Sequence, residues 1–333
     1  MRRAALASTT RVPMQLPDYA IEAEGLYKTY AGTKTTPPKQ ALNGIDLKIP
    51  RGSIFGLLGP NGAGKSTFIN ILAGLTKKTS GTVRIWGRDI DERSRDARAA
   101  IGVVPQELAA DVFFTPRESL EVQAGMYGVP KSERKTDELL AALGLSDKAG
   151  AYVRMLSGGM KRRLMVAKAM VHSPPVLILD EPTAGVDVEL RRQLWNYVIG
   201  LNRQGVTIVL TTHYLEEAQE LCDQIAIVNR GEVTACEPTE TLLKRLDTRN
   251  VVVTPEEPVA TAPDLTGFET RLRGGGSFAV TYKTGQSSVE QVLAAVRASG
   301  LHIKDIATED PDLEDVFLAL TYDAPGGVSP TKD

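Results

Sequence analysis

The chain has 333 residues, 42% of them hydrophobic and 24% charged, which predicts about two globular domains with a large core. A formal net charge of -2, with basic and acidic residues interspersed, gives no electrostatic case for a nucleic-acid partner. No apolar run approaches the roughly eighteen residues of a membrane-spanning helix, and the two cysteines, Cys222 and Cys236, lack metal or redox spacing, so we expect a cytosolic protein.

The N-terminal region begins with the polar residues 1–19, which show no periodicity and are interpreted as a disordered extension. Strand patterns follow at residues 20–27, 42–49 and 53–58, and a loop rich in Thr, Pro and Lys lies at 31–40. The last of these strands is a short apolar run, which is typical of a strand buried on both faces of a sheet.

A glycine-rich loop follows that buried strand and leads into an apolar helix. The loop consists of Gly59, Pro60, Asn61, Gly62, Ala63, Gly64, Lys65, Ser66 and Thr67. Strand, glycine loop, lysine, hydroxyl and helix form the phosphate-binding P-loop, in which backbone N–H groups and a helix N-terminus face one anion. Lys65 would place its ammonium at the β- and γ-phosphates, and the Ser66 hydroxyl would bind Mg²⁺. A glycine-rich turn without a ligand is the alternative.

The middle of the chain, about 107–170, has helical patterns and follows strands at 81–87 and 101–106. A capping box at residues 115–118, with proline in the first turn, predicts a helix to about Tyr127. A second helix is expected over 131–143. A third opens at Leu156, Ser157, Gly158, Gly159 and Met160, with apolar residues on one face and basic residues elsewhere.

Apolar strands alternate with helices after residue 175, which predicts a largely parallel α/β sheet. The first of these strands, Val176–Asp180, is followed by Glu181. Asp180 at the end of such a strand can hold Mg²⁺, and Glu181 can accept a proton from the water that attacks the γ-phosphate. The alternative is that both carboxylates cap the next turn. The later elements are helices at 189–201 and 215–222, a strand at 206–213 and a hairpin at 225–235.

The C-terminal part carries a proline-rich, loop-like boundary at residues 247–266. Beyond it, strands at 269–273, 277–282 and 303–306, a helix opened by a capping box at Ser287, and a last helix capped by Asp310-Pro311 predict a small α+β domain over 267–322. Residues 323–333 are interpreted as a frayed tail.

The segment Leu156–Met160 is a second glycine-containing helix start, and therefore a second anion site. One nucleotide does not need two such sites from one chain, so Ser157, Gly158 and Gly159 are expected to face a γ-phosphate that another copy holds. With these motifs in order, residues 20–240 closely resemble the nucleotide-binding subunit of the ATP-binding cassette (ABC) transporter family. That resemblance implies a P-loop NTPase cassette with a mixed sheet, an antiparallel β subdomain and a helical subdomain, over residues 20–246.

The resemblance also assigns roles to single residues. Tyr30 would stack on adenine, Gln106 would be the Q-loop amide that touches Mg²⁺ and the membrane partner, and Asp187 would lie in the D-loop, which crosses to the other subunit. Glu181 would be the catalytic base, and His213 would contact the γ-phosphate. The alternatives are packing for Tyr30, a plain surface amide for Gln106 and a structural histidine for His213.

The resemblance implies ATP and Mg²⁺ as ligands, a second cassette subunit, with a homodimer expected, and a separate permease with about six membrane helices per half. The chain would lie on the cytoplasmic face of a bacterial inner membrane. The ending Pro311–Thr321 is similar to that of the daunorubicin-resistance and nodulation-factor exporters, so export is expected. The competing hypotheses are a soluble cassette ATPase acting on ribosomes or DNA, and a regulatory module that binds ATP without hydrolysing it.

Overall fold

The computed structural model describes residues 16–33, 35–107, 111–246, 248–309 and 312–321. Most of the extension expected at 1–19, and the tail expected at 323–333, therefore lie outside the described residues. The chain divides into two compact units. One comprises residues up to 55, 64–211 and 230–232, and the other comprises 56–63, 212–229 and 233 onward. No helix in the described ranges is long and apolar enough to cross a membrane.

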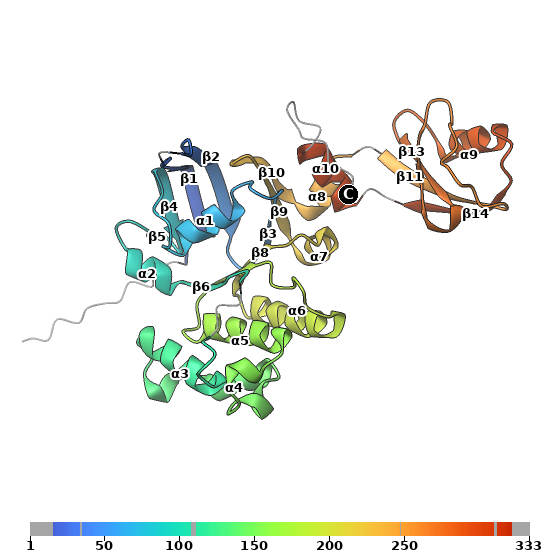
Figure 1. Ribbon diagram of the computed structural model, residues 1–333. Coiled ribbons are helices and arrows are strands. Elements are labelled where there is room, and N and C mark those ends of the chain that lie inside the picture. Colours follow the sequence, from blue (N-terminus) through green and yellow to red (C-terminus); the bar gives the residue numbers. More distant parts are fainter. Residues whose placement is uncertain (1–15, 34, 108–110, 247, 310–311, 322–333) are drawn as a thin grey trace, which may run out of the picture. The chain divides into compact units, whose positions relative to one another are not determined.

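The first unit contains a four-stranded antiparallel sheet in the order β2-β1-β4-β5 (Figure 1). Its strands are β1 (Tyr19–Tyr30), β2 (Lys39–Pro50), β4 (Ser80–Ile85) and β5 (Arg88–Asp89). The two long strands pair from Tyr19↔Pro50 to Tyr30↔Lys39, so each is longer than its sequence pattern predicts. Because Tyr19 already pairs, ordered structure begins inside the stretch expected to be an extension.

The same unit contains three parallel strands, β6 (Ile101–Val104), β7 (Val176–Asp180) and β8 (Thr207–Thr211), in the order β8-β7-β6. All five residues of β7 are buried, as expected for a strand covered on both faces. The register pairs Asp180 with Thr211, so the carboxyl ends of these two strands lie side by side. The start of β3 (Ile54–Leu58) runs beside β8, since the Ile208 N–H donates to the Ser53 carbonyl over 2.9 Å.

The helices of the first unit match most of the predicted pattern. They are α1 (Lys65–Leu72), α2 (Ser94–Ala99), α3 (Pro116–Met126), α4 (Thr136–Ala142), α5 (Gly158–Met170) and α6 (Val188–Arg203). The capping box of α3 forms, with Thr115 as the N-cap. The helix expected over 131–143 is instead a 3-10 turn followed by α4, because Arg134 turns back to donate to the Val129 carbonyl at 3.1 Å and to Glu121 at 2.6 Å.

The second unit contains the end of β3 and the predicted hairpin, in the strand order β10-β9-β3. The hairpin strands are β9 (Gln224–Asn229) and β10 (Glu232–Pro238), and the neighbouring helices are α7 (Leu215–Leu221) and α8 (Thr239–Leu243). Close approach requires glycine at position 56, where an added Cβ would lie 3.1 Å from both Cys222 and Ile225. This packing buries Cys222, and burial raises the pKa of its thiol to about 12.

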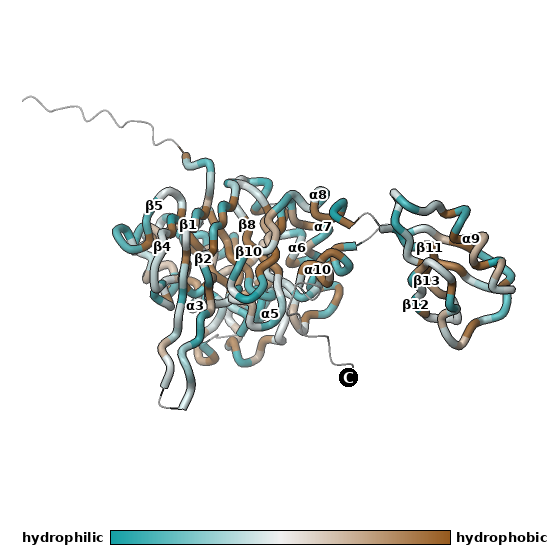
Figure 2. The backbone as a smooth tube through the Cα atoms, turned by 90° about the horizontal axis from the view of Figure 1, so that it is seen from above, coloured by the Kyte–Doolittle hydropathy of each residue, from teal (hydrophilic) through white to brown (hydrophobic). Residues whose placement is uncertain are grey.

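The second unit also contains a separate antiparallel sheet in the order β12-β13-β11-β14. Its elements are β11 (Thr248–Pro255), β12 (Glu269–Leu272), β13 (Phe278–Lys283), α9 (Val289–Ala298) and β14 (Ile303–Glu309). The first half of the expected 247–266 loop is therefore strand β11, whose Val251 and Val253 are fully buried beside Phe278 and Val280. Figure 2 shows the apolar positions along β11 and β13 that form this core.

The last helix, α10 (Leu313–Thr321), contacts α7, α8 and β9. The expected cap at Asp310-Pro311 lies outside the described residues. The Leu313 N–H donates to the Gln219 side chain over 2.8 Å, and Asn229 donates to the Thr321 carbonyl over 3.1 Å. The assignment of this helix to the small α+β domain is thus corrected: its apolar stripe, which includes Leu313 and Val316, is buried against the cassette helix α7 and its neighbours.

Candidate functional site

The P-loop begins helix α1 without any side-chain cap. Its N-cap is Gly64, with φ 112° and ψ -4°, a left-handed conformation that favours glycine. A Cβ at this position would lie 2.7 Å from the Ala41 carbonyl oxygen. Earlier in the loop, Gly62 has φ +79° and nothing within 4 Å of an added Cβ, which leaves space on that side of the backbone. The N-cap glycine thus supplies no side-chain oxygen to the first turn of α1, and a helix start of this kind suits an anion.

Lys65, the first residue of α1, is only 7% exposed. Burial lowers the pKa of its ammonium, and the charges of Glu181 and then Asp180 act in the opposite direction. The structure therefore places the P-loop lysine within electrostatic reach of both predicted carboxylates. A buried cation that faces two carboxylates near an uncapped helix start is suited to bind a phosphate group and a divalent cation together.

The two carboxylates follow β7 and are held by the adjacent strand. Asp180 is 8% exposed and accepts a 2.5 Å hydrogen bond from the Thr211 hydroxyl. The Glu181 N–H donates to the Thr211 carbonyl and hydroxyl oxygens, each over 3.1 Å, and Glu181 has φ 49°. Thr211 thus fixes both residues. Sequence reasoning gave it no role, because only the strand pairing brings it to Asp180.

Gln106 lies directly beside the predicted catalytic base. Its amide Nε2 donates to Glu181 Oε2 over 2.7 Å. The backbone carbonyls of Pro105 and Gln106 in turn accept hydrogen bonds of 2.8 and 2.9 Å from the two terminal nitrogens of Arg162. Arg162 was expected away from the apolar face of its helix, yet it is only 5% exposed. Gln106 is exposed, and a side-chain hydrogen bond connects it to Glu181.

Tyr30 lies at the end of β1, next to the P-loop. Its hydroxyl is 3.5 Å from the Thr67 hydroxyl, and the Lys28 ammonium is 4.6 Å from the centre of its ring. The side chain is 39% exposed, so it is not a core packing residue. A half-exposed aromatic ring at this place can stack on a base whose phosphates lie in the P-loop.

The second glycine-containing helix start, that of α5, is capped by its own serine. Ser157 accepts a hydrogen bond of 3.3 Å from the Met160 N–H. Gly158 is exposed and has open space around it, whereas a Cβ at Gly159 would lie 2.3 Å from a methyl group of Leu190. Asp187 caps the neighbouring helix α6 by accepting from the Leu190 N–H at 3.0 Å. Gly159 at the start of α5 and Asp187 at the start of α6 therefore both lie beside Leu190.

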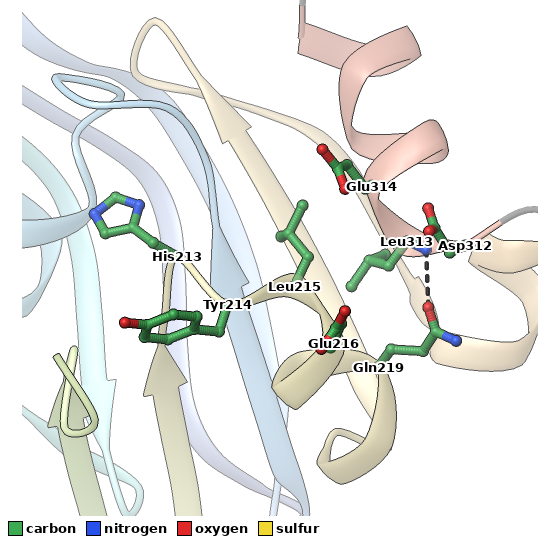
Figure 3. Close-up of a pocket in the computed structure, with 8 residues that line it drawn as sticks. All are labelled: His213, Tyr214, Leu215, Glu216, Gln219, Asp312, Leu313 and Glu314. Carbon is green, nitrogen blue, oxygen red and sulfur yellow. Dashed lines mark hydrogen bonds between the residues drawn. The ribbon is translucent and has the colours of Figure 1, made fainter. Parts of the chain in front are cut away.

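His213 belongs to the second unit and is exposed. It lines a pocket with residues of α7 and the start of α10, among them Gln219 and Leu313. Figure 3 shows the imidazole pointing away from the hydrogen bond between Gln219 and Leu313. The residue follows β8 by two positions, as the sequence predicts.

The predicted metal-binding side chains suit a hard cation. Ser66, Gln106 and Asp180 offer hydroxyl, amide and carboxylate oxygens, the donor types that Mg²⁺ prefers. The Thr211 hydroxyl donates to Asp180 Oδ1 and so orients the carboxylate. Within the described ranges no three His, Cys, Asp or Glu side chains are grouped as a metal cage. A set with one carboxylate fits Mg²⁺, which is usually bound through one or two carboxylates together with phosphates and water.

A family model and several known proteins match this chain. Residues 42–184 match the family model described as ABC transporter. The linearmycin resistance ATP-binding protein of Bacillus subtilis is 35% identical, with 90% of this chain and 98% of that protein covered. The Nod factor export ATP-binding protein I of Paraburkholderia xenovorans is 37% identical (92% and 98% covered), and the daunorubicin/doxorubicin resistance ATP-binding protein of Streptomyces peucetius is 36% identical (92% and 93% covered).

Solved structures show the same fold. An ATP-binding subunit of an ABC transporter aligns with a TM-score of 0.61 and 28% identity, covering 68% of this chain and 92% of that chain. A dimeric ATP-binding cassette in a post-hydrolysis state, bound to ADP and Pi, aligns with a TM-score of 0.60 and 28% identity, covering 66% of this chain and 98% of that chain. The predicted cassette architecture, with its mixed sheet and antiparallel subdomain, is confirmed, and the sheet after residue 247 is additional to it.

Proposed function

This chain belongs to the ABC transporter family as an ATP-binding, ATP-hydrolysing subunit of an exporter, and from that premise we propose that two copies enclose two molecules of Mg·ATP and drive export through a separate permease. Relatives at about the same identity include both drug-resistance and Nod factor export proteins. This spread supports the general transport role.

The grouping of Lys65 with Asp180, Glu181 and Gln106 carries the proposal. Lys65 would bind the β- and γ-phosphates, with the uncapped N–H groups of α1 around them. Glu181, fixed by Thr211 at its backbone, would accept the proton of the attacking water. The Gln106 amide donates to one of the two carboxylate oxygens of Glu181 and would compete there with the attacking water.

Mg²⁺ would neutralise charge on the phosphates during transfer, held by Asp180, Ser66 and Gln106. Asp180 is prepared for this by its hydrogen bond from Thr211, which fixes one of its oxygens. Tyr30 would stack on the adenine ring, since its hydroxyl already lies near Thr67 of the P-loop. His213 would donate to the γ-phosphate from its exposed position after β8.

A second copy would complete each site with the residues at the start of its helix α5. Ser157 and Gly158 are exposed, and so are Gly185 and Asp187 of the D-loop, which suits them to meet another protomer. A γ-phosphate between the P-loop of one copy and Ser157 of its partner would hold the dimer closed. Its removal by hydrolysis would let the dimer open. The dimeric cassette bound to ADP and Pi supports this arrangement.

The permease would dock on the helical region about α3. Phe113 is 73% exposed, Met126 78% and Val122 46%, so apolar side chains gather near both ends of this helix and on its face. Exposed apolar residues at such density mark an interaction surface. We place the protein at the cytoplasmic face of the membrane through this contact, bound to a partner that spans the bilayer.

The test is Glu181→Gln. Removing the base while keeping its shape should lower the kcat of ATP hydrolysis by about 10²–10⁴-fold. ATP binding should persist, and the variant should accumulate as an ATP-bound dimer in size-exclusion chromatography with light scattering. Near-normal hydrolysis by this variant would remove Glu181 from the role of base, and a monomer at saturating ATP would contradict the shared enclosure.

A further inference from the structure

We propose that Arg162 is a positioning residue for ATP hydrolysis: it joins helix α5 to the Q-loop, residues 105–107, and so decides where the Gln106 amide lies relative to Glu181. The proposal rests on the proposed function, because it assigns the Gln106–Glu181 pair to the hydrolytic site. It adds a residue outside every motif that the sequence pattern singled out.

Arg162 contacts the Q-loop backbone through two hydrogen bonds. Strand β6 ends at Val104, and the next two backbone carbonyls, those of Pro105 and Gln106, each accept from a different terminal nitrogen of Arg162, at 2.8 and 2.9 Å. A planar guanidinium reaches two successive carbonyls in a fixed geometry that an ammonium cannot reproduce. Arg162 therefore fixes both the position and the orientation of the Q-loop backbone.

The fixed backbone leaves the Gln106 side chain as the moving part. In this structure its amide donates to Glu181 Oε2 over 2.7 Å and so occupies one of the two carboxylate oxygens of the base. With the Gln106 carbonyl held by Arg162, the amide can exchange the carboxylate for a metal ion by side-chain rotation alone. Without Arg162, the backbone of the whole Q-loop would have to be repositioned in each cycle of ATP hydrolysis.

Arg162 also connects the two halves of the enclosure. It lies on α5, whose N-cap is Ser157, so the helix that faces the partner's nucleotide carries the residue that holds this protomer's Q-loop. Closure of the dimer on Ser157 would thereby act on Gln106 of the other site. The carboxylates of Asp180 and Glu181 favour the charged guanidinium, although burial lowers the pKa of Arg162.

The neighbouring Arg163 provides a matched control. It lies on the same helix, is 8% exposed and also donates to backbone carbonyls, at 2.7 Å to Leu143 and 3.5 Å to Gly144. Its backbone partners follow α4 and it also contacts Gln193 of α6, whereas the partners of Arg162 are in the Q-loop. A purely structural role for buried arginines on α5 would therefore affect both positions alike, and a positioning role would set Arg162 apart.

The experiment is a double-mutant cycle on the full chain, with R162K, R163K and Q106A measured singly and in pairs. R162K should lower the kcat of ATP hydrolysis about tenfold with an unchanged dissociation constant for ATP, since it misplaces a reacting group without touching the nucleotide. In the Q106A background R162K should cause no further loss, because its effect passes through Gln106. R162K should also raise the Mg²⁺ concentration for half-maximal activity, and R163K should leave that concentration unchanged.

Thermal unfolding of each variant accompanies the cycle, and R162Q replaces R162K if the latter does not fold. The proposal is overturned if the losses from R162K and Q106A multiply, or if R162K keeps the wild-type kcat. As the control result, we expect the fractional losses of kcat from R163K and from Q106A to multiply in the double variant. An inactive wild-type protein would refute the proposed function instead, so the two failures are distinguishable.

Discussion

Two glycine-containing helix starts in the first unit, those of α1 and α5, are built in opposite ways. The N-cap of α1 is Gly64, in a left-handed conformation with no side-chain cap, and the next residue, Lys65, is buried. The N-cap of α5 is Ser157, in an extended conformation, and its own hydroxyl accepts from the first turn. The first turn of α1 thus receives no cap from a side chain, whereas the first turn of α5 receives one from its own exposed N-cap serine. We infer that a single protomer binds nucleotide at α1, and that α5 acts only when a second protomer approaches.

The largest expected effect tests the α1 half of this comparison. Lys65→Ala should weaken ATP binding by the monomer and lower hydrolysis by roughly 10³-fold, because it removes the cation that we propose binds the phosphates. Binding is measured with a fluorescent ATP analogue, and hydrolysis by phosphate release. The matched control is Lys161→Ala near the start of α5, which should keep monomer binding within about twofold, as expected of a surface substitution. Equal losses of ATP binding in Lys65→Ala and Lys161→Ala would contradict the proposed difference between the two helix starts.

The role of the α5 start is tested by Ser157→Arg, which should weaken ATP binding by the monomer less than Lys65→Ala does. A long cationic side chain at the exposed helix start should block approach of the partner's nucleotide. Hydrolysis should then fall about 10²-fold, because the site loses the hydrogen bonds that the second protomer would provide. Binding of the ATP analogue to the monomer should stay near the wild-type value. An ATP-dependent dimer of normal stability, seen by light scattering, would contradict the assignment of Ser157 to the shared site.

The sequence predicts those parts of the site that depend on local chain geometry. The P-loop glycines, Ser157 and the Asp180-Glu181 pair each lie in a short segment whose strand or helix context is readable along the chain. Thr211 and Arg162 were missed for a common reason: each acts through a contact with a residue at least 31 positions away, Asp180 for Thr211 and the Q-loop for Arg162. A basic residue in a helix pattern indicates a solvent-facing side chain, and only the folded structure shows it buried on two carbonyls.

The C-terminal region shows a second limit of the pattern. Prolines over residues 247–266 favour a loop, yet β11 forms there because its alternating valines, among them Val251 and Val253, fill the core of the small sheet. Likewise, the apolar stripe of α10 indicates that the helix is buried without saying against what, and its partners are α7 and α8. Tertiary packing decided both outcomes, as it commonly does where local propensity is weak.

The smallest predicted effect separates capping from catalysis. Thr115 caps α3 and Ser157 caps α5, each by accepting from a backbone N–H of the first turn, at 3.2 Å from Glu118 and 3.3 Å from Met160. Replacing either by alanine should lower the free energy of unfolding by about 1 kcal/mol, the usual cost of a lost N-cap, measured by urea denaturation. Only Ser157→Ala should also lower ATP hydrolysis, because its hydroxyl would face the partner's γ-phosphate as well. If the two variants lost stability and activity in parallel, Ser157 would be a helix cap and nothing more.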